Sequence, residues 1–215
     1  MQPSALSMLN SSDLSFQYPG GESFSFPDLS CQAGETRLLL GKSGSGKTTM
    51  LQLLAGLRRP AAGKVIINGQ LLSDLSGTAL DHFRGQHIGM IFQTAHFLQA
   101  LTVAENLRIA QKLAGKPTNE ERIYELLSQL DLSEKARSLP GRLSVGQQQR
   151  AAIARALINE PAVLFADEPT SALDDENTQQ VVNLLQEQAE RVGATLLIVT
   201  HDNRLTSLIP QQTHL

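Results

Sequence analysis

Residues 41 to 49, GKSGSGKTT, carry the clearest chemical pattern in the sequence. Gly41, Gly44 and Gly46 can adopt backbone angles that are closed to other residues, so successive N–H groups can converge on a phosphate. Lys47 would reach the β- and γ-phosphates of a nucleoside triphosphate, and the Thr48 hydroxyl could ligate Mg²⁺. The predicted phosphate loop comprises Gly41, Ser43, Gly44, Ser45, Gly46, Lys47, Thr48 and Thr49.

Two acids close the apolar run AVLFADE, residues 162 to 168. Asp167 stands where the strand-end aspartate of nucleotide hydrolases addresses the metal ion. Glu168 projects differently and can act as the base for a water in line with the γ-phosphate. Alone, the pair would also fit the cap of a following helix, because Pro169 signals a turn. Beside a complete phosphate loop, metal ligation and base catalysis are favoured.

Two further polar residues, His201 and Gln93, also follow apolar runs. At the edge that carries the phosphate loop, His201 would donate to the γ-phosphate and position the attacking water. Gln93 would contact Mg²⁺ or that water. Taken singly, each residue better fits a polar side chain at a strand end without a chemical role, and the neighbouring motifs favour the chemical one.

Tyr18 lies close to the turn made by Gly20 and Gly21. Its ring could stack on adenine, as aromatic side chains do on base faces. Packing within a strand is the alternative. Because binding residues concentrate on loops, the stacking interpretation is favoured.

The elements that must position these residues form an alternating pattern. We predict largely apolar strands at 36–40, 88–92, 162–166 and 195–199, and helices at 47–57, 144–158 and 174–192. Such alternation is typical of a parallel sheet covered by helices on both faces, with ligands at the carboxyl ends of its strands. The shorter pieces before residue 36 (ALSMLN, LSFQ and SFSF) predict a small antiparallel sheet. The predicted fold class is therefore α/β, a P-loop nucleoside triphosphatase core with an N-terminal antiparallel β-subdomain.

An all-helical block interrupts this pattern between about residue 93 and residue 149. Three amphipathic stretches, 101–113, 119–130 and 132–137, predict consecutive helices. Thr102 and Glu105 form the pattern of a capping box at the start of the first. We expect a single domain over residues 1–215, with a core at 1–92 and about 150–215 and the helical block inserted between them.

Composition limits the partners and the compartment. The net charge is −3, from 18 basic and 21 acidic side chains, which argues against a nucleic-acid partner. Cys31 is the only cysteine, so no internal disulfide forms. No apolar run reaches 18 residues, and the N-terminus lacks the pattern of a signal peptide. We expect a cytoplasmic protein unless a partner holds it elsewhere.

Six motifs in order complete a resemblance to the ATP-binding cassette family: residues 41–49, Gln93, LSVGQ, LFADE, SALD and His201. The resemblance spans nearly the whole chain, from about Tyr18 to His201. It implies a head-to-tail pair of chains, a homodimer or a paired cassette, that closes on ATP. The signature residues Leu143, Ser144, Gly146 and Gln147 would serve the partner's ATP, and Asp174 would run along the seam and couple the two sites. The commonest signature of the family has glycine at the position of Val145.

The resemblance also implies a membrane partner. The sequences of several loops resemble those of the small cassettes that drive MacB, LolD and DevA-type permeases. An integral membrane permease would dock near Gln93–Leu101, which is apolar for a loop, although Phe97 and Leu98 could simply pack the helical block. The chain would then sit peripherally on the inner face of the membrane. The alternative is a soluble cassette ATPase acting in translation or DNA repair, which the single copy and the acidic balance disfavour.

Overall fold

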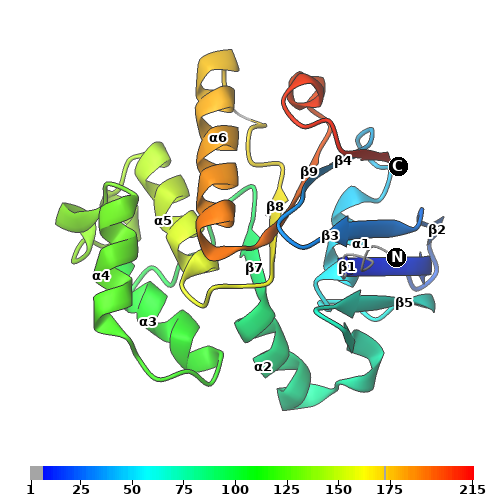
Figure 1. Cartoon of the computed structure of the whole chain (residues 1–215), viewed down its shortest axis with the longest axis horizontal. Helices are drawn as coiled ribbons and strands as arrows, with labels where there is room; N and C mark the ends of the chain where they lie inside the picture. The colour runs from blue at the N-terminus through cyan, green and yellow to red at the C-terminus, as the bar shows by residue number, and fades with distance from the viewer. Residues whose placement is uncertain (1–6, 172) are drawn as a thin grey trace, which may run out of the picture.

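A five-stranded parallel sheet forms the centre of the molecule. The computed structural model describes residues 7–171 and 173–215, so residues 5 and 6 of the predicted piece ALSMLN, and Ala172, lie outside the described part. The strand order is β10 (Gln212–His214), β4 (Thr36–Leu40), β9 (Thr195–Thr200), β8 (Val163–Asp167) and β7 (Ile88–Ile91). All four neighbouring pairs are parallel. This confirms the predicted sheet, which Figure 1 shows running through the middle of the molecule.

Both faces of the inner strands of this sheet are covered. Alternate side chains of each strand point to opposite faces, so one strand contributes to two apolar clusters. On β8, Val163 and Phe165 join the apolar cluster that contains helix α1 (Lys47–Leu54). Leu164 and Ala166 join a second cluster with α5 (Val145–Leu157) and α6 (Asp175–Val192). Strands with no solvated face carry continuous apolar runs, which is why the sequence predicts them well.

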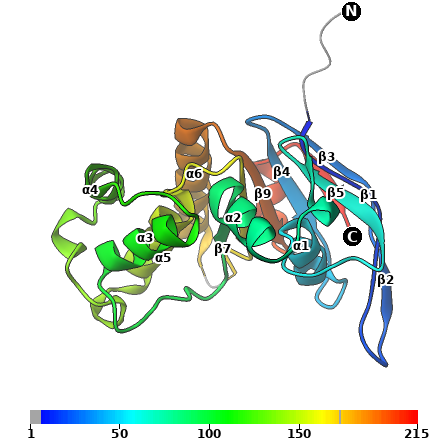
Figure 2. The same ribbon diagram turned by 90° about the horizontal axis from the view of Figure 1, so that it is seen from below.

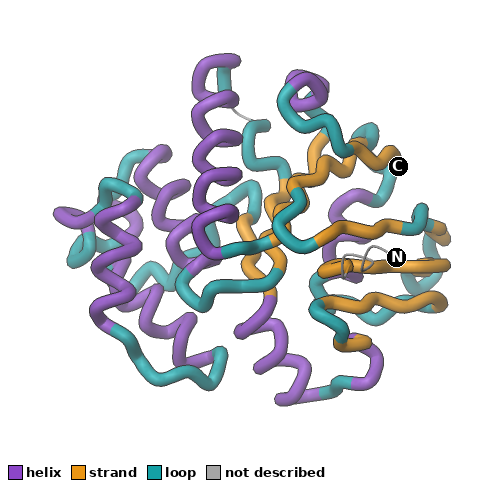
Figure 3. The backbone as a smooth tube through the Cα atoms, in the orientation of Figure 1, coloured by secondary structure: helices purple, strands orange, loops and turns teal. Residues whose placement is uncertain are grey.

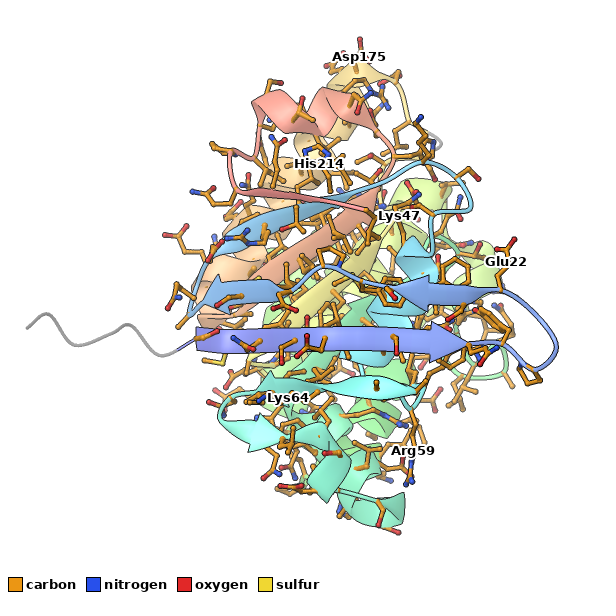
Figure 4. All side chains as sticks on the ribbon, turned by 90° about the vertical axis from the view of Figure 1, so that its right-hand side faces the viewer. Glu22, Lys47, Arg59, Lys64, Asp175 and His214 are labelled. Carbon is orange, nitrogen blue, oxygen red and sulfur yellow. The ribbon has the colours of Figure 1, made fainter. Side chains whose placement is uncertain are left out.

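A second sheet covers the other side of α1. It consists of β1 (Ser7–Gln17), β2 (Ser23–Ser25), β3 (Leu29–Gln32), β5 (Ala62–Ile67) and β6 (Gln70–Leu71), all paired antiparallel. Figure 4 looks onto this sheet, with the phosphate-loop residue Lys47 beyond its upper edge. Apolar residues of β1 and β3 pack with α1 in one cluster. The predicted N-terminal β-subdomain is therefore confirmed, with β5 and β6 as additional members.

The helical block lies on the opposite side of the molecule from the antiparallel sheet (Figures 1 and 3). It contains α3 (Val103–Leu113), α4 (Glu120–Gln129) and the start of α5. Seen from below, α2 and α6 lie between this block and the strands (Figure 2). Helix α5 runs unbroken past residue 149, so the predicted boundary of the block falls inside a helix. Among the described residues, no helix combines the length and the apolar character needed to cross a bilayer.

Two local predictions were wrong. Residues 132–137 form only a short 3₁₀ turn, η2 (Ser133–Lys135), because six residues between two turns are too few for a packed amphipathic helix. Residues 7–10 of the piece ALSMLN and the piece LSFQ are not separate strands but lie in the single strand β1. A register shift between Ser12 and Ser15 interrupts its pairing with β5, and Asp13 between them has a φ of 54°.

Helix α2 and strand β10 are among the elements that were not predicted. Helix α2 (Gly77–His87) buries none of its residues, so its sequence lacks the apolar stripe that reveals a packed helix. Strand β10 is the polar tripeptide Gln212–His214, and it exists because its backbone pairs with β4. Neither element leaves a hydrophobic pattern in the sequence.

The predicted capping box at α3 is present and can be tested. The Thr102 hydroxyl accepts from the Glu105 N–H at 3.3 Å, and the Glu105 carboxylate accepts from the Thr102 N–H at 2.8 Å. Thr102→Ala should lower the free energy of unfolding by about 1 kcal/mol, because the Glu105 N–H loses its acceptor and the Glu105 carboxylate loses the hydroxyl that donates to it. Urea unfolding measures this change. Thr102→Ser is the matched control and should stay close to the parent; equal losses in both variants would contradict the capping role.

Candidate functional site

A cavity of about 460 Å³ opens at the carboxyl end of the parallel sheet. Its walls come from distant parts of the chain: the turn after β1 with strand β2, the loop between β4 and α1 with the start of α1, the loop after β7, and the ends of β8 and β9. The lining residues are Tyr18, Phe24, Ser43, Gly44, Gly46, Lys47, Thr48, Thr49, Gln93, Glu168 and His201. The structure therefore brings together most of the side chains that the sequence analysis selected.

The loop between β4 and α1 wraps around the side chain of Lys47, the first residue of α1. The Lys47 ammonium donates to the carbonyl oxygen of Gly41 at 2.8 Å and to that of Lys42 at 3.0 Å. The residue is only 8% exposed. Its charge is thus held at the mouth of the loop, next to the N-terminus of α1, where helix N–H groups favour an anion.

The glycines of this loop serve two different purposes. Gly44 and Gly46 have φ values of 81° and 92°, a region that residues with a Cβ avoid, as predicted. Gly41 has no positive φ. A Cβ there would lie 2.5 Å from the Ser45 hydroxyl oxygen and 3.0 Å from the Cβ of Leu215. Gly41 is therefore required for close packing, which corrects the expectation that all three glycines supply unusual backbone angles.

Glu168 is the most constrained side chain in the site. Its backbone has a φ of 48°, and its N–H donates to the carbonyl oxygen of Val199 at 2.8 Å. The Thr200 hydroxyl donates to Oε2 at 2.8 Å, and Nδ1 of His201 lies 2.8 Å from Oε1. The Lys47 ammonium lies 3.6 Å from Oε1. These contacts fix the direction of a carboxylate that borders the cavity.

Asp167, the last residue of β8, meets the phosphate loop directly. Its Oδ2 accepts from the Thr48 hydroxyl at 3.5 Å, whereas its buried Oδ1 has no partner among the described residues. Burial raises the pKa of Asp167 above its ordinary value, the negative charge of Glu168 adds to this, and Thr48 and Lys47 oppose it. A carboxylate with a free buried oxygen beside a hydroxyl fits a divalent cation.

This pair suits Mg²⁺ in particular. No cluster of three or more His, Cys, Asp or Glu side chains suited to a metal occurs within the described ranges. Mg²⁺ does not need one, because it usually takes one or two carboxylates and completes its shell with water and substrate phosphates. Thr48 and Asp167 would supply two protein ligands, and Gln93, which lines the same cavity, would supply the third.

For Gln93 and Tyr18, the contacts fit both a structural role and a ligand-binding role. Nε2 of Gln93 donates to the Ser171 hydroxyl at 3.0 Å, which ties the loop after β7 to the segment after β8. The Tyr18 hydroxyl lies 2.9 Å from the Thr49 hydroxyl, and its ring meets Phe16 edge-on at 4.9 Å. Tyr18 is thus packed against its own strand and also borders the cavity.

The residues LSVGQ lie elsewhere. Leu143 is buried, and Ser144 is the N-cap of α5. The Ser144 hydroxyl accepts from the Gln147 N–H at 3.3 Å, and Oε1 of Gln147 accepts from the Ser144 N–H at 3.1 Å. None of residues 143–147 lines the phosphate-loop cavity. Val145 instead lines a second cleft of about 230 Å³, which adjoins the cavity and shares Gln93 and Glu168 with it.

Asp174 occupies the N-cap of α6. Its carboxylate accepts from the N–H of Asn177 at 2.9 Å, and the residue is exposed. Within one chain it therefore caps a helix, and it does not line the cavity.

Several residues of the site were not predicted. Thr200 binds Glu168, Ser171 binds Gln93, and Nε2 of Gln149 on α5 donates to the carbonyl oxygen of Pro169 at 3.0 Å. Thr200 has a weak signal in the sequence, as the last residue of an apolar strand before His201. The other two have none, because their partners lie far away along the chain.

Comparison with known proteins gives consistent results. A family model described as "ABC transporter" matches residues 26–171. The methionine import ATP-binding protein MetN 2 of Pectobacterium atrosepticum is 46% identical over 176 residues, which are 81% of this chain and 52% of that protein. The lipoprotein-releasing system ATP-binding protein LolD of Bacteroides fragilis is 40% identical over 190 residues, which are 87% and 88%. This chain thus spans about half the length of the MetN relative and most of LolD.

Solved structures agree. The dimeric bacterial ABC transporter cassette MJ0796 superposes with a TM-score of 0.84 at 32% identity, covering 97% of this chain and 94% of that one. A dimeric post-hydrolysis state of MJ0796 bound to ADP and Pi gives a TM-score of 0.83 at the same identity and coverage.

Two buried threonines at the two ends of β9 allow a matched test of the Glu168 contacts. The Thr200 hydroxyl donates to Glu168 and accepts from the Asp202 N–H at 3.0 Å; the Thr195 hydroxyl donates to Gln32 O and accepts from the Gly34 N–H. Thr200→Val and Thr195→Val should each lower the free energy of unfolding by about 1–3 kcal/mol, since each leaves two polar groups unpaired. Only Thr200→Val should also slow hydrolysis of a nucleoside triphosphate. Equal turnover in the two variants would show that Thr200 does not position Glu168.

Proposed function

The chain belongs to the ABC transporter family, and from this premise we propose that it hydrolyses ATP as the nucleotide-binding subunit of a transporter. The observation that carries the proposal is the convergence of Lys47, Glu168 and His201 on one cavity, while the turn at Ser144 lies outside it. Each chain would thus hold the catalytic half of an ATP site, and a second chain would complete it.

Within one chain, each residue has a defined task. The phosphate loop and Lys47 bind the phosphates, and Tyr18 stacks on adenine. Glu168 accepts a proton from the attacking water, which suits a carboxylate held in direction by Thr200 and His201. His201 uses Nδ1 toward Glu168 and offers Nε2 to the γ-phosphate, and Gln93 contacts the water. Thr48, Asp167 and Gln93 would hold Mg²⁺, which would neutralise charge on the phosphates.

The signature residues support completion by a second chain. A Cβ on Gly146 would meet nothing within 4 Å, and the residue has no positive φ. Glycine inside a helix costs about 1 kcal/mol relative to alanine, so nothing within this chain favours it there. Its absence of a side chain suits the close approach of an external group, for which a γ-phosphate at a helix N-terminus is a good fit.

Val145 does not disturb this arrangement. It is 78% exposed and is not among the residues with positive φ, so valine replaces the family's commoner glycine without backbone strain. The Ser144 hydroxyl and the Gly146 N–H remain available at the exposed start of α5.

ATP would therefore join two chains and hydrolysis would separate them. The γ-phosphate distinguishes ATP from ADP, and it is the group that both halves of the shared site would contact. Its loss removes those contacts, which shifts the equilibrium toward open chains. Asp174, at the exposed start of α6, would lie along the seam and couple the two sites.

A membrane permease would use this movement. The loop Gln93–Leu101 is held in place by Asn106, whose side chain binds the backbone of Leu98, Leu101 and Thr102. Phe97 is buried beneath it, so the alternative of core packing fits this residue, whereas Leu98 is 53% exposed. A neighbouring cleft has a mainly apolar lining of Ala55, Leu57, Gly85, Ile88, Met90, Phe92 and Leu113, with the charged residues Asp81 and Arg84. We propose that a permease segment docks here, which would place the chain at the inner face of the membrane.

The relatives favour a transporter over a soluble cassette acting in translation or DNA repair. LolD, matched over most of both chains, supports an exporting or lipoprotein-releasing system. MetN is named as an importer and matches at higher identity over a shorter part of its length. We propose the LolD-like assignment, because it accounts for the larger share of both sequences.

Replacing the proposed base tests the reaction. Glu168→Gln keeps the hydrogen-bonding shape of the side chain but removes the base, so ATP turnover should fall by about 100-fold or more. The ATP-bound dimer should then accumulate and be visible by sedimentation with ATP. A variant that turns over ATP normally would remove Glu168 as the base.

Mixing two inactive chains tests the shared site. Ser144→Arg blocks the signature turn, and Lys47→Ala removes the phosphate contact, so each chain alone should be inactive. Together they can form one intact site from Lys47 of the first chain and Ser144 of the second. Part of the ATP turnover should therefore return on mixing. Complete inactivity of the mixture, with both chains folded, would contradict the head-to-tail arrangement.

A further inference from the structure

The segment from Glu168 to Asp175 joins the proposed base to the proposed dimer seam. Side chains from three separate elements hold its described residues. Gln149 of α5 binds the carbonyl oxygen of Pro169, and Gln93 binds the hydroxyl of Ser171. The third holder is Arg204, in the turn η4 (Asn203–Ser207) after β9. Figure 1 shows η4 beside the upper end of α6, and Figure 4 shows Asp175 at that end.

Arg204 spans the gap between η4 and the start of α6. Nη1 and Nη2 each donate to the carbonyl oxygen of Leu173 at 3.2 Å, and Nη1 donates to Oδ1 of Asp175 at 2.7 Å. Nη2 donates to Oδ2 of Asp202 at 2.7 Å, and Nε donates to Oδ1 at 2.9 Å. The guanidinium therefore forms hydrogen bonds with both neighbours of Asp174 in the chain, Leu173 and Asp175. A planar group with several fixed donors suits this geometry, which an ammonium group cannot reproduce.

Asp202 continues the connection to the base. Its Oδ2 accepts from the Thr170 hydroxyl at 3.3 Å, and its N–H donates to the Thr200 hydroxyl at 3.0 Å. That hydroxyl in turn donates to Glu168. The hydrogen bonds from Arg204 are the main reason that the pKa of Asp202 lies below its ordinary value. A continuous set of hydrogen bonds therefore runs from the backbone beside Asp174 to the carboxylate of Glu168.

We propose that Arg204 is a positioning residue that holds Asp174 in register with Glu168 and His201, so that ATP turnover in the closed dimer depends on it. The proposal rests on the function proposed above and extends it to a residue that lines no part of the ATP cavity. Arg204 would act only once the seam forms, because the segment that it grips would contact the second chain. Binding of ATP to the phosphate loop of one chain would not require it.

Stability is a poor explanation for the contact between Arg204 and Asp175. The side chain of Arg204 is 39% exposed and that of Asp175 is 90% exposed. Ion pairs in such solvated positions contribute little to folding. The contacts join η4 to the segment before α6. Their main effect is therefore to fix the position of that segment relative to η4.

The test compares Arg204→Ala with Arg191→Ala. Arg191 is the matched control, because it pairs with Glu187 at 2.7 Å one turn away on α6 and joins no second element. Arg204→Ala should lower kcat for ATP by about tenfold to a hundredfold, the range expected from a small misplacement near the reacting groups, with KM little changed. Arg191→Ala should leave both values at the parent level. Arg204→Lys, which keeps the charge but not the fork, should fall between parent and alanine variant.

Dimer formation separates this inference from the proposed function. In a Glu168→Gln background, ATP should produce a dimer, and Arg204→Ala should weaken that dimer while the affinity of the monomer for ATP stays at the parent value. If the Glu168→Gln chain itself stays monomeric, the proposed dimer fails and the role of Arg204 fails with it. If that chain dimerises and Arg204→Ala retains parental kcat and dimer affinity, only the inference about Arg204 is overturned. A variant that merely loses stability, with parental kcat at low temperature, would overturn it as well.

Discussion

Burial of the parallel sheet on both faces is the constraint on which the rest of the structure depends. Its strands β8 and β9 have no solvated face, so polar chemistry can appear only where they end. The register places those ends level: Leu40 pairs with Thr200, Asp167 with Val199, and Ile91 with Ala166. Residues that follow four distant strands therefore meet around one cavity.

The same arrangement governs the electrostatics of that cavity. Lys47 is fixed by backbone carbonyl oxygens, and Glu168 by a hydroxyl and an imidazole. Glu168 also keeps a φ of 48°, which non-glycine residues adopt at a cost of about 1 kcal/mol or more. That conformation persists because the neighbouring strand β9 supplies partners for both the backbone and the side chain. The structure thus holds a carboxylate in one direction at the end of a buried strand.

Position also explains why one chain would not suffice for the proposed reaction. The turn at Ser144 starts a helix of the helical block and does not line the cavity of its own chain. The segment after Glu168 connects the two regions, since α5, the loop after β7 and η4 all bind it. A contact at the exposed start of α5 or α6 therefore lies only a few hydrogen bonds from the carboxylate of the same chain. This is the physical basis for the coupling that we propose between paired sites.

Local sequence by itself determined the phosphate loop, the apolar strands, the main helices and the capping box at Thr102, because each depends on residues close together in the chain. It also indicated Asp167, Glu168 and His201. These polar residues directly follow buried strands, and the ends of such strands meet at one edge of a parallel sheet. Only the tertiary structure decided what pairing across the fold creates: α2, β10, the close packing of Gly41, and the grip of Arg204 on the segment before α6. These features depend on neighbours far away in sequence, and such neighbours leave no periodic pattern in the chain.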